Sequence, residues 1–271
     1  MGVSDRAPES GVAGSPCFPH RPSEPHSLHY NPGRSFVAET VSGFPSQEPN
    51  TQMNPPDSLD LMRQAWVRLL EGYRVTATDG GPVFDLLVAA HSAPDRHYHN
   101  LEHLGEMFRA AARLATITDD LASVQLAIWF HDAVYDPRAR DNETRSADLA
   151  TTLLGPIGVP RSELERVMKL ILATAHLSEH PIAGDRETAI LLDADLAILA
   201  ASRERYRRYA ADVRKEYAWV SDEHYRAGRT AVLNQFLARP RIYLTDLAYQ
   251  EDEERARSNM TAERDALIAG K

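Results

Sequence analysis

The amino-acid sequence predicts an all-α protein, with one helical domain over residues 56–271 behind a disordered tail. Nearly every segment after Asp57 repeats its apolar residues with the period of an α-helix. No stretch of convincing length alternates apolar and polar residues as a half-buried strand does, and no internal repeat is found. The roughly 210 residues of this domain suffice for one sizeable hydrophobic core.

Residues 1–55 are expected to be the disordered tail. They are rich in Pro, Ser and Gly and show no apolar periodicity, so they bury too little apolar surface to offset the entropy of ordering. No continuous apolar segment follows their few charges, which argues against a secretory signal. Met53 opens the first orderly segment, and a misassigned upstream start over residues 1–52 stays an open alternative.

The first part of the domain shows clear signals for helix starts and ends. A Gly-Gly-Pro sequence at 80–82 separates the first helix from the second. Asp120 is a suitable N-cap for the fourth helix, and Pro137 ends it. These signals predict four helices, over 58–73, 82–91, 100–115 and 121–135.

The second part continues the helical period but changes in composition. Six further helices are expected, over 142–154, 161–177, 186–201, 203–219, 221–238 and 251–268. The last three carry many charges, which is typical of an outer layer of solvated amphipathic helices. The alternative interpretation is that an arginine such as Arg214 or Arg229 reaches a phosphate of the substrate.

Composition excludes several classes of protein. No apolar run approaches the 18 residues that a membrane span needs, so we expect no membrane partner. The formal net charge of −9 argues against a general nucleic-acid binder but leaves room for a local basic pocket. The single cysteine, Cys17, lies in the tail, so the chain offers no internal disulfide or thiolate metal site. These features fit a cytoplasmic protein, and a homo-oligomer stays open.

The dipeptide His131-Asp132 is the sharpest chemical feature of the sequence. It directly follows the apolar run 126–130. An Asp at the end of a buried run costs several kcal/mol unless it is paired or bound to a cation. Imidazole and carboxylate together suit a divalent ion such as Zn, Fe or Mn. For the dipeptide alone, the alternative is a surface histidine and aspartate at the end of a helix.

Two more polar features lie within apolar helices. His99 and His103 are four residues apart, which places both imidazoles on one helix face. Glu102 precedes the second histidine instead of following the first, so a zincin peptidase is disfavoured. Asp193 and Asp195 lie in a second apolar helix, and we favour Asp195 as the ligand because its neighbours three and four residues away are aliphatic. Asp193 is then expected to act as a cap or to support a ligand.

Taken in order, these residues resemble the HD superfamily of phosphohydrolases, whose pattern is H…HD…D. The resemblance is to the bacterial group of predicted metal-dependent HD phosphohydrolases. It spans about residues 96–263, and the matching segments are RHYHNLEHL, WFHDAVYDP, DNETRSA, LDADLAILA, VRKEYAWV, GRTAVLNQFL and ARSNMTAE. It implies an HD-domain-like helical bundle, hydrolysis of a small phosphorylated substrate, and a metal held by His103, His131, Asp132 and Asp195.

Other residues are assigned roles around this metal. Glu143 is expected to act as the general acid or base, the alternative being a favourable charge at a helix N-terminus. Substrate phosphate is expected to contact Arg96, His99, Arg145 and Lys169. For each of the three cations a surface salt bridge is the alternative. His176 is a catalytic candidate, or else a histidine that suits a helix C-terminus.

One divalent transition metal ion (Mn, Fe, Zn or similar) is expected in preference to two. Some relatives bind a second metal through two well-separated histidines, whereas His176 and His180 are only four residues apart. Two other functions stay open. One is a dinuclear iron oxygenase, which the superfamily also contains. The other is a non-catalytic module that binds a nucleotide in a metal-stabilised pocket.

Overall fold

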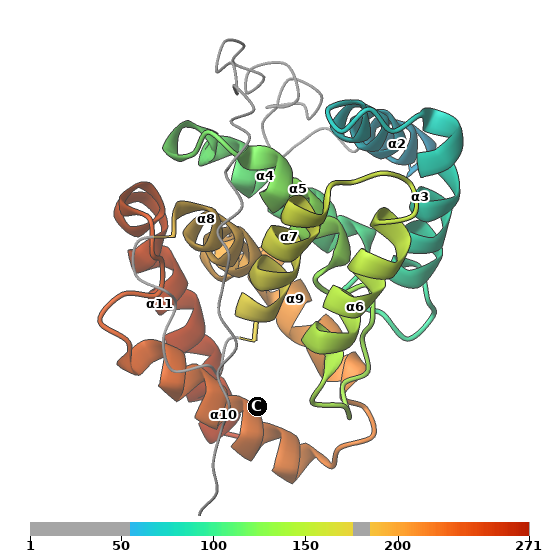
Figure 1. Ribbon diagram of the computed structural model, residues 1–271. Helices are drawn as coiled ribbons and strands as arrows, with labels where there is room; N and C mark the ends of the chain where they lie inside the picture. The colour runs from blue at the N-terminus through green and yellow to red at the C-terminus, as the bar shows by residue number, and fades with distance from the viewer. Residues whose placement is uncertain (1–54, 176–184, 271) are drawn as a thin grey trace, which may run out of the picture. The chain divides into compact units, whose positions relative to one another are not determined.

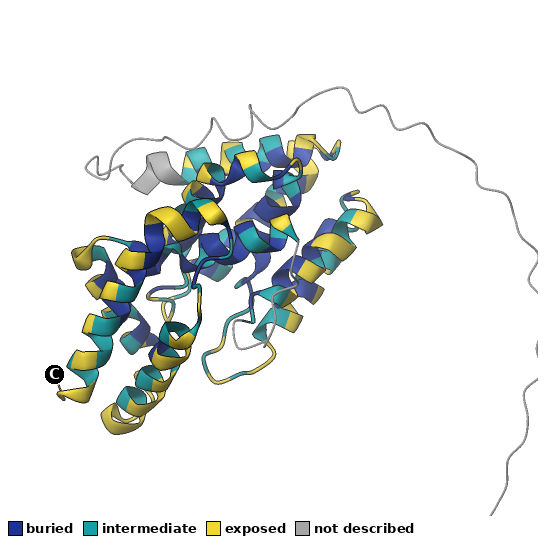
Figure 2. Cartoon of the chain, turned by 90° about the vertical axis from the view of Figure 1, so that its left-hand side faces the viewer, coloured by how far each residue is buried: buried dark blue, intermediate teal, exposed yellow. Residues whose placement is uncertain are grey.

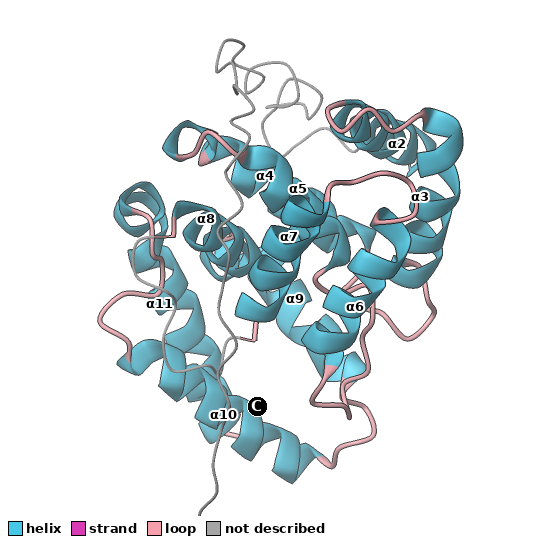
Figure 3. Cartoon of the chain, in the orientation of Figure 1, coloured by secondary structure: helices cyan, strands magenta, loops and turns pink. Residues whose placement is uncertain are grey.

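A computed structural model describes residues 55–175 and 185–270, and its described residues are all-α, as predicted. Figure 3 shows helices joined by loops and turns. The helices are α2 (Pro55–Glu71), α3 (Ala77–His91), α4 (Leu101–Arg113), α5 (Leu121–Phe130), α6 (Asn142–Leu154), α7 (Arg161–Ala173), α8 (Arg186–Asp195), α9 (Arg203–Glu216), α10 (Asp222–Ala238) and α11 (Asp246–Ile268). Two 3₁₀ helices, η1 (Ala115–Ile117) and η2 (Leu196–Ala200), complete the set. Nearly all of the predicted tail lies outside the described residues.

Helix α5 lies at the centre of the helical arrangement. It packs against α4, α6, α7 and α8 (Figure 1). Every residue of α5 except Ala122 is buried, because the sequence of this helix is apolar almost all round. The outer helices instead bury one side and expose the other (Figure 2). The burial of α5 places whatever follows its C-terminus deep in the protein.

Several predicted helix boundaries were wrong, among them the start of α11 at Asp246, and three of them have a clear local reason. α3 begins at Ala77, ahead of the Gly-Gly-Pro sequence, because the Thr76 hydroxyl caps it by accepting a hydrogen bond from the Asp79 N–H. α5 ends at Phe130, so His131 caps the helix and Asp132 lies in the following turn. The helix expected over 186–201 changes at Leu196 into the tighter turns of η2.

An aromatic cluster joins α2 and α3 to the central helix. The ring of Trp129 contacts Trp66 edge-on at 5.6 Å between centroids and Phe84 at 5.5 Å. The indole Nε1 of Trp66 donates a hydrogen bond to the carbonyl of Gly80 at 2.9 Å. Buried apolar side chains from these and the remaining helices form one continuous cluster. Among the described residues, no helix combines the length and the apolar character that a membrane span requires.

Alanine substitutions at the two neighbouring glycines of α3, Gly80 and Gly81, should have opposite effects on stability. At Gly81 an added Cβ meets nothing within 4 Å, so Gly81→Ala should raise the free energy of unfolding by about 0.5–1 kcal/mol through helix propensity. At Gly80 the Cβ would overlap the buried Leu70 side chain, and overpacking costs about 1–3 kcal/mol. Urea unfolding of both variants measures the difference. Two variants more stable than wild type would show that Leu70 moves aside freely.

Candidate metal centre

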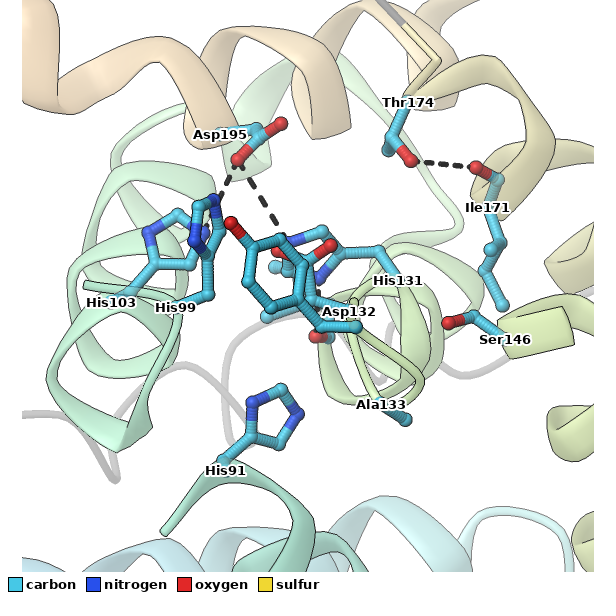
Figure 4. A network of polar contacts seen from close by, with 12 residues as sticks. His91, His99, His103, His131, Asp132, Ala133, Ser146, Ile171, Thr174 and Asp195 are labelled. Atoms are coloured by element: carbon cyan, nitrogen blue, oxygen red, sulfur yellow. Dashed lines mark hydrogen bonds and ion pairs between the residues drawn. The ribbon is translucent and has the colours of Figure 1, made fainter. Parts of the chain in front are cut away.

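Four side chains from three helix ends form the His-Asp cluster, which consists of His103, His131, Asp132 and Asp195. His103 lies in the first turn of α4, His131 and Asp132 follow α5, and Asp195 is the last residue of α8. These three helices pack against one another, which brings residues distant in the sequence together (Figure 4). Ligand atoms of His103, His131 and Asp132 all lie within 4.8 Å of one another, so this group could hold a metal ion.

Asp195 adds a second carboxylate to this group. Its Oδ1 lies 3.3 Å from Nε2 of His103 and 3.9 Å from Nε2 of His131. On the other side, Oδ2 of Asp132 lies 3.1 Å from Nε2 of His131. Metal–ligand bonds of about 2.0–2.2 Å place two ligands of one ion about 3 to 4 Å apart. The distances from both carboxylates to the histidines therefore suit a shared ion, and His103, His131 and Asp132 form the group whose ligand atoms all lie close to one another.

The two imidazoles are buried, and their Nε2 atoms have no hydrogen-bond partner among the described residues. Nearby carboxylate oxygens are close enough for ion pairing but are not aligned for a hydrogen bond. A buried polar atom without a partner costs about 1–3 kcal/mol. The nitrogen and oxygen atoms of the cluster instead match the donor set that Zn, Fe or Mn prefers.

Local hydrogen bonds fix the orientation of both histidines. Nδ1 of His131 lies 3.0 Å from the carbonyl oxygen of Ile128, which leaves Nε2 facing the cluster. The Asn100 side chain caps α4 by accepting hydrogen bonds from the N–H groups of Glu102 and His103. The cap sets where the helix starts and hence where His103 lies. Asp136, four residues after Asp132, accepts a hydrogen bond from the Arg138 N–H.

The electrostatics of the His-Asp cluster favour a cation at its centre. Burial opposes protonation of His131, but Asp132 and then Asp195 outweigh it and raise its pKa to about 9. Despite burial, His131 lowers the pKa of Asp132. A proton and a metal ion compete for the same Nε2 atom, so metal binding would release that proton.

The two aspartates of α8 have different roles. Asp193 is buried and accepts hydrogen bonds from the backbone N–H groups of Leu244 (2.7 Å) and Thr245 (2.8 Å) and from the Thr245 hydroxyl (2.7 Å). It therefore anchors the start of α11, while Asp195 joins the His-Asp cluster. The choice of Asp195 as the candidate ligand agrees with this arrangement. The reason given for it, that Asp195 lies on the buried face of the helix, was wrong, because Asp193 is the more buried of the two.

Arg96 was predicted to contact substrate phosphate, but its guanidinium is bonded to the protein backbone. Its guanidinium donates hydrogen bonds to the backbone carbonyls of Asp132 (2.5 Å), Ala133 (3.0 Å) and His99 (3.2 Å). These bonds join the segment before α4 to the turn after α5. Arg96 thus positions the backbone that carries Asp132, because its donors are directed at carbonyl groups instead of at open space.

Arg145 and Lys169 lie on the surface, and the structure supports the alternative interpretation for both. Half of each side chain is exposed, and each is paired with a nearby carboxylate, Arg145 with Asp141 at 3.9 Å and Lys169 with Asp185 at 2.9 Å. Exposed pairs of this kind contribute at most about 1 kcal/mol. His176 and His180 lie outside the described residues.

Glu143 lies half-buried in the first turn of α6. Three residues later on the same helix face, the hydroxyl of Ser146 is bonded to the backbone N–H (3.0 Å) and carbonyl (3.2 Å) of Val134. This contact ties the start of α6 to the turn after His131 and Asp132. The role of Glu143 as general acid or base stays a prediction.

Glu216 is a site residue that the sequence analysis missed. It ends α9, is buried, and its Oε2 lies 2.7 Å from Nδ1 of His99. Hydrogen bonds from the ring and backbone of His99 and from the backbone of Tyr98 lower the pKa of Glu216 to about 2 despite burial. His99, although partly buried, has a raised pKa because of Glu216 and the neighbouring aspartates. The only signal was the segment VRKEYAWV, whose helix is too highly charged to reveal which residue is buried.

His91 is buried beneath the site and remains neutral. Nε2 lies 3.3 Å from the carbonyl oxygen of Trp129, and Nδ1 lies 3.4 Å from a guanidinium nitrogen of Arg96. Burial, and then the charge of Arg96, lowers the pKa of His91 to about 3. Here a buried histidine contacts Arg96 and the carbonyl of Trp129.

Because His91 stays neutral in the folded protein, we expect the protein to lose stability in acid. Between pH 6.5 and 3 the unfolded chain binds a proton at His91 that the folded chain excludes, so the free energy of unfolding falls as pH drops below about 6.5. The slope is about 1.4 kcal/mol per pH unit for one group. In urea unfolding at pH 7.5 and pH 5.5, His91→Gln should lose about 1 kcal/mol less than wild type. Equal losses would contradict a neutral His91.

Comparisons with known proteins do not assign the chain to a family. No family model matches the chain, and no curated protein matches it. The chemistry of the site therefore has to be inferred from its four clustered side chains and the residues that orient them.

Proposed function

We propose that this protein is a metal-dependent phosphohydrolase of the HD type that acts on a small phosphate ester. One observation carries the proposal: two buried imidazoles present Nε2 atoms, which have no hydrogen-bond partner among the described residues, to two carboxylates that lie within 4 Å. Such an arrangement is costly in a protein that binds no cation there. The resemblance of its H…HD…D pattern to the HD superfamily adds the reaction class.

His103, His131, Asp132 and Asp195 would hold the ion. Two imidazoles and two carboxylates suit one divalent transition metal ion and leave coordination positions open. When bound, such an ion lowers the pKa of a coordinated water toward 7 and polarises a phosphoryl oxygen. The buried end of α5 excludes bulk water from one side of the site, which strengthens electrostatic interactions within it.

Residues of the chain orient the reacting groups. The carbonyl of Ile128 keeps Nε2 of His131 directed inward, and Arg96 holds the turn that carries Asp132. Glu143 is assigned the proton transfer to the leaving oxygen, as the sequence analysis predicts. A substrate that offers one phosphoryl group, such as a nucleotide, matches a site with a single cluster of ligands.

A panel of phosphate esters tests the proposal. Purified protein reconstituted with Mn, Fe, Zn or Mg should release phosphate from at least one phosphomonoester or cleave one phosphodiester, and a chelator should stop the reaction. Metal-loaded protein that leaves every ester intact would contradict the proposed function. Two iron ions per chain together with oxygen consumption would instead indicate the oxygenase, and ligand binding without turnover would indicate the binding module.

A further inference from the structure

The carboxylate of Glu216 links three segments beside the His-Asp cluster. Its Oε1 accepts hydrogen bonds from the backbone N–H groups of Tyr98 at 2.7 Å and His99 at 3.0 Å. Its Oε2 accepts a hydrogen bond from the Tyr135 hydroxyl at 3.0 Å and lies 2.7 Å from Nδ1 of His99. One carboxylate from α9 thus fixes both the backbone and the imidazole of His99.

Aromatic contacts confine the same imidazole. It stacks on Tyr135 with 4.2 Å between centroids and meets Tyr98 edge-on at 4.9 Å. The ring of His103 lies 5.8 Å away, and Figure 4 shows His99 beside it. Asp132 and Asp195 both act electrostatically on His99. The His99 ring is therefore held at the edge of the metal centre in one orientation.

Nε2 of His99 is the atom left available by this arrangement. Nδ1 faces Glu216, so Nε2 lies on the opposite edge of the ring, where none of the described residues hydrogen-bonds to it. Part of the side chain, 22%, is exposed to solvent. A phosphoryl group next to the ion needs hydrogen-bond donors, and Arg96, the cation expected to supply them, is bonded to backbone carbonyls.

We propose that Glu216 is a positioning residue that holds His99 as an imidazolium, with Nδ1–H donating to the carboxylate, so that Nε2–H donates a hydrogen bond to the phosphoryl group of the substrate. The inference rests on the proposed phosphohydrolase function and adds a residue pair that recognises the phosphoryl group. Because Nδ1–H donates to Glu216, Nε2 carries a proton only when the ring is the imidazolium cation, and the buried carboxylate 2.7 Å from Nδ1 stabilises that cation. His99 is then the residue that touches substrate, and Glu216 acts through it.

If Glu216 only stabilised the fold, its replacement would not affect substrate recognition. Glu253 is a buried glutamate with such a structural role and serves as the matched control. Glu253 is also buried and accepts hydrogen bonds from two consecutive backbone N–H groups, those of Ile242 and Tyr243. It contacts neither His99 nor the His-Asp cluster. Glu216→Gln and Glu253→Gln each keep one carbonyl oxygen for the backbone N–H groups, so both should fold. Only Glu216→Gln changes the group that faces a histidine ring.

The kinetic test compares these two variants in the metal-reconstituted protein. Glu216→Gln and His99→Gln should lower kcat/KM by about 10-fold to 100-fold, the usual effect of losing one charge-assisted hydrogen bond. Metal content should stay at the wild-type level in both. Glu253→Gln should keep kcat/KM within about twofold, since surface and structural changes away from a site alter stability instead. Equal effects of Glu216→Gln and Glu253→Gln on kcat/KM would overturn the positioning role of Glu216.

A second readout does not depend on turnover. Long-range ¹H–¹⁵N NMR spectra resolve the ring nitrogens of His99, whose signals are identified by their absence in His99→Gln. In zinc-reconstituted protein, inorganic phosphate should shift the Nε2 signal of His99 in wild type and shift it less in Glu216→Gln. No shift at His99 on saturation with phosphate would overturn the inference. If wild type shows the shift but hydrolyses no ester, the proposed hydrolysis fails while the recognition of phosphate stands.

Discussion

Asp132→Ala is expected to remove metal binding and hydrolysis together. The carboxylate lies 3.1 Å from Nε2 of His131, within the group that could hold an ion. Without it the ion loses one of two negative ligands at a buried site. Because a metal ion acting as a Lewis acid is worth several kcal/mol of barrier, kcat should fall about a thousandfold or more. Elemental analysis should find about one transition metal per wild-type chain and almost none in the variant.

The matched control for this experiment is Asp136→Ala. Asp136 lies four residues after Asp132 in the same connecting segment, is exposed, and accepts a hydrogen bond from the Arg138 N–H. It should keep the wild-type metal content, because it contacts neither histidine of the cluster. Both proteins need a purification tag without histidines. Full metal content in Asp132→Ala would refute the metal centre, whatever its activity.

Asp193→Ala is expected to lower the free energy of unfolding by about 3 kcal/mol. Its buried carboxylate receives three hydrogen bonds from Leu244 and Thr245, all between 2.7 and 2.8 Å, of which the two from Thr245 are buried and the one from Leu244 is partly buried. Removal leaves these donors without partners, at about 1–3 kcal/mol for each buried unsatisfied group. Effects within one network are not additive, so the total stays below the sum. Urea unfolding of chelator-treated protein measures the loss.

The comparison with Asp195→Ala separates the two aspartates of α8. In chelator-treated protein, Asp195→Ala should change the free energy of unfolding by no more than about 1 kcal/mol, because 15% of its side chain is exposed and its negative charge disfavours that of Asp132. Its metal content should nevertheless fall. If Asp195→Ala destabilised the metal-free chain as much as Asp193→Ala, the assignment of separate roles would be wrong.

Helix type could be predicted from the sequence with more success than helix ends. The apolar period of α5 and the Asp120 cap identified that helix, and the cap is confirmed by the hydrogen bond from the Ser123 N–H. Its C-terminus was placed five residues too late, at 135, because apolar residues continue past Phe130 into the turn. Apolar periodicity reports burial, and burial here extends beyond the regular helix.

The candidate site was partly predictable for a similar reason. His131 and Asp132 stand out because polar residues after an apolar run need a partner, a requirement that holds for any fold. The choice between Asp193 and Asp195 has no such local basis. Both carboxylates lie in one short helix, and their roles differ only because Thr245 reaches one and His103 the other.

The sequence by itself determined the all-α class, the approximate helices and the residue types of the His-Asp cluster, because these depend on local periodicity and on the cost of burying charge. Only the tertiary structure decided that Glu216 meets His99 and that Arg96 binds the carbonyls of Asp132 and Ala133. Those partners come from segments far apart in the chain. Which side chains meet across packed helices depends on the angles and registers of packing, which the spacing of residues along one helix does not specify.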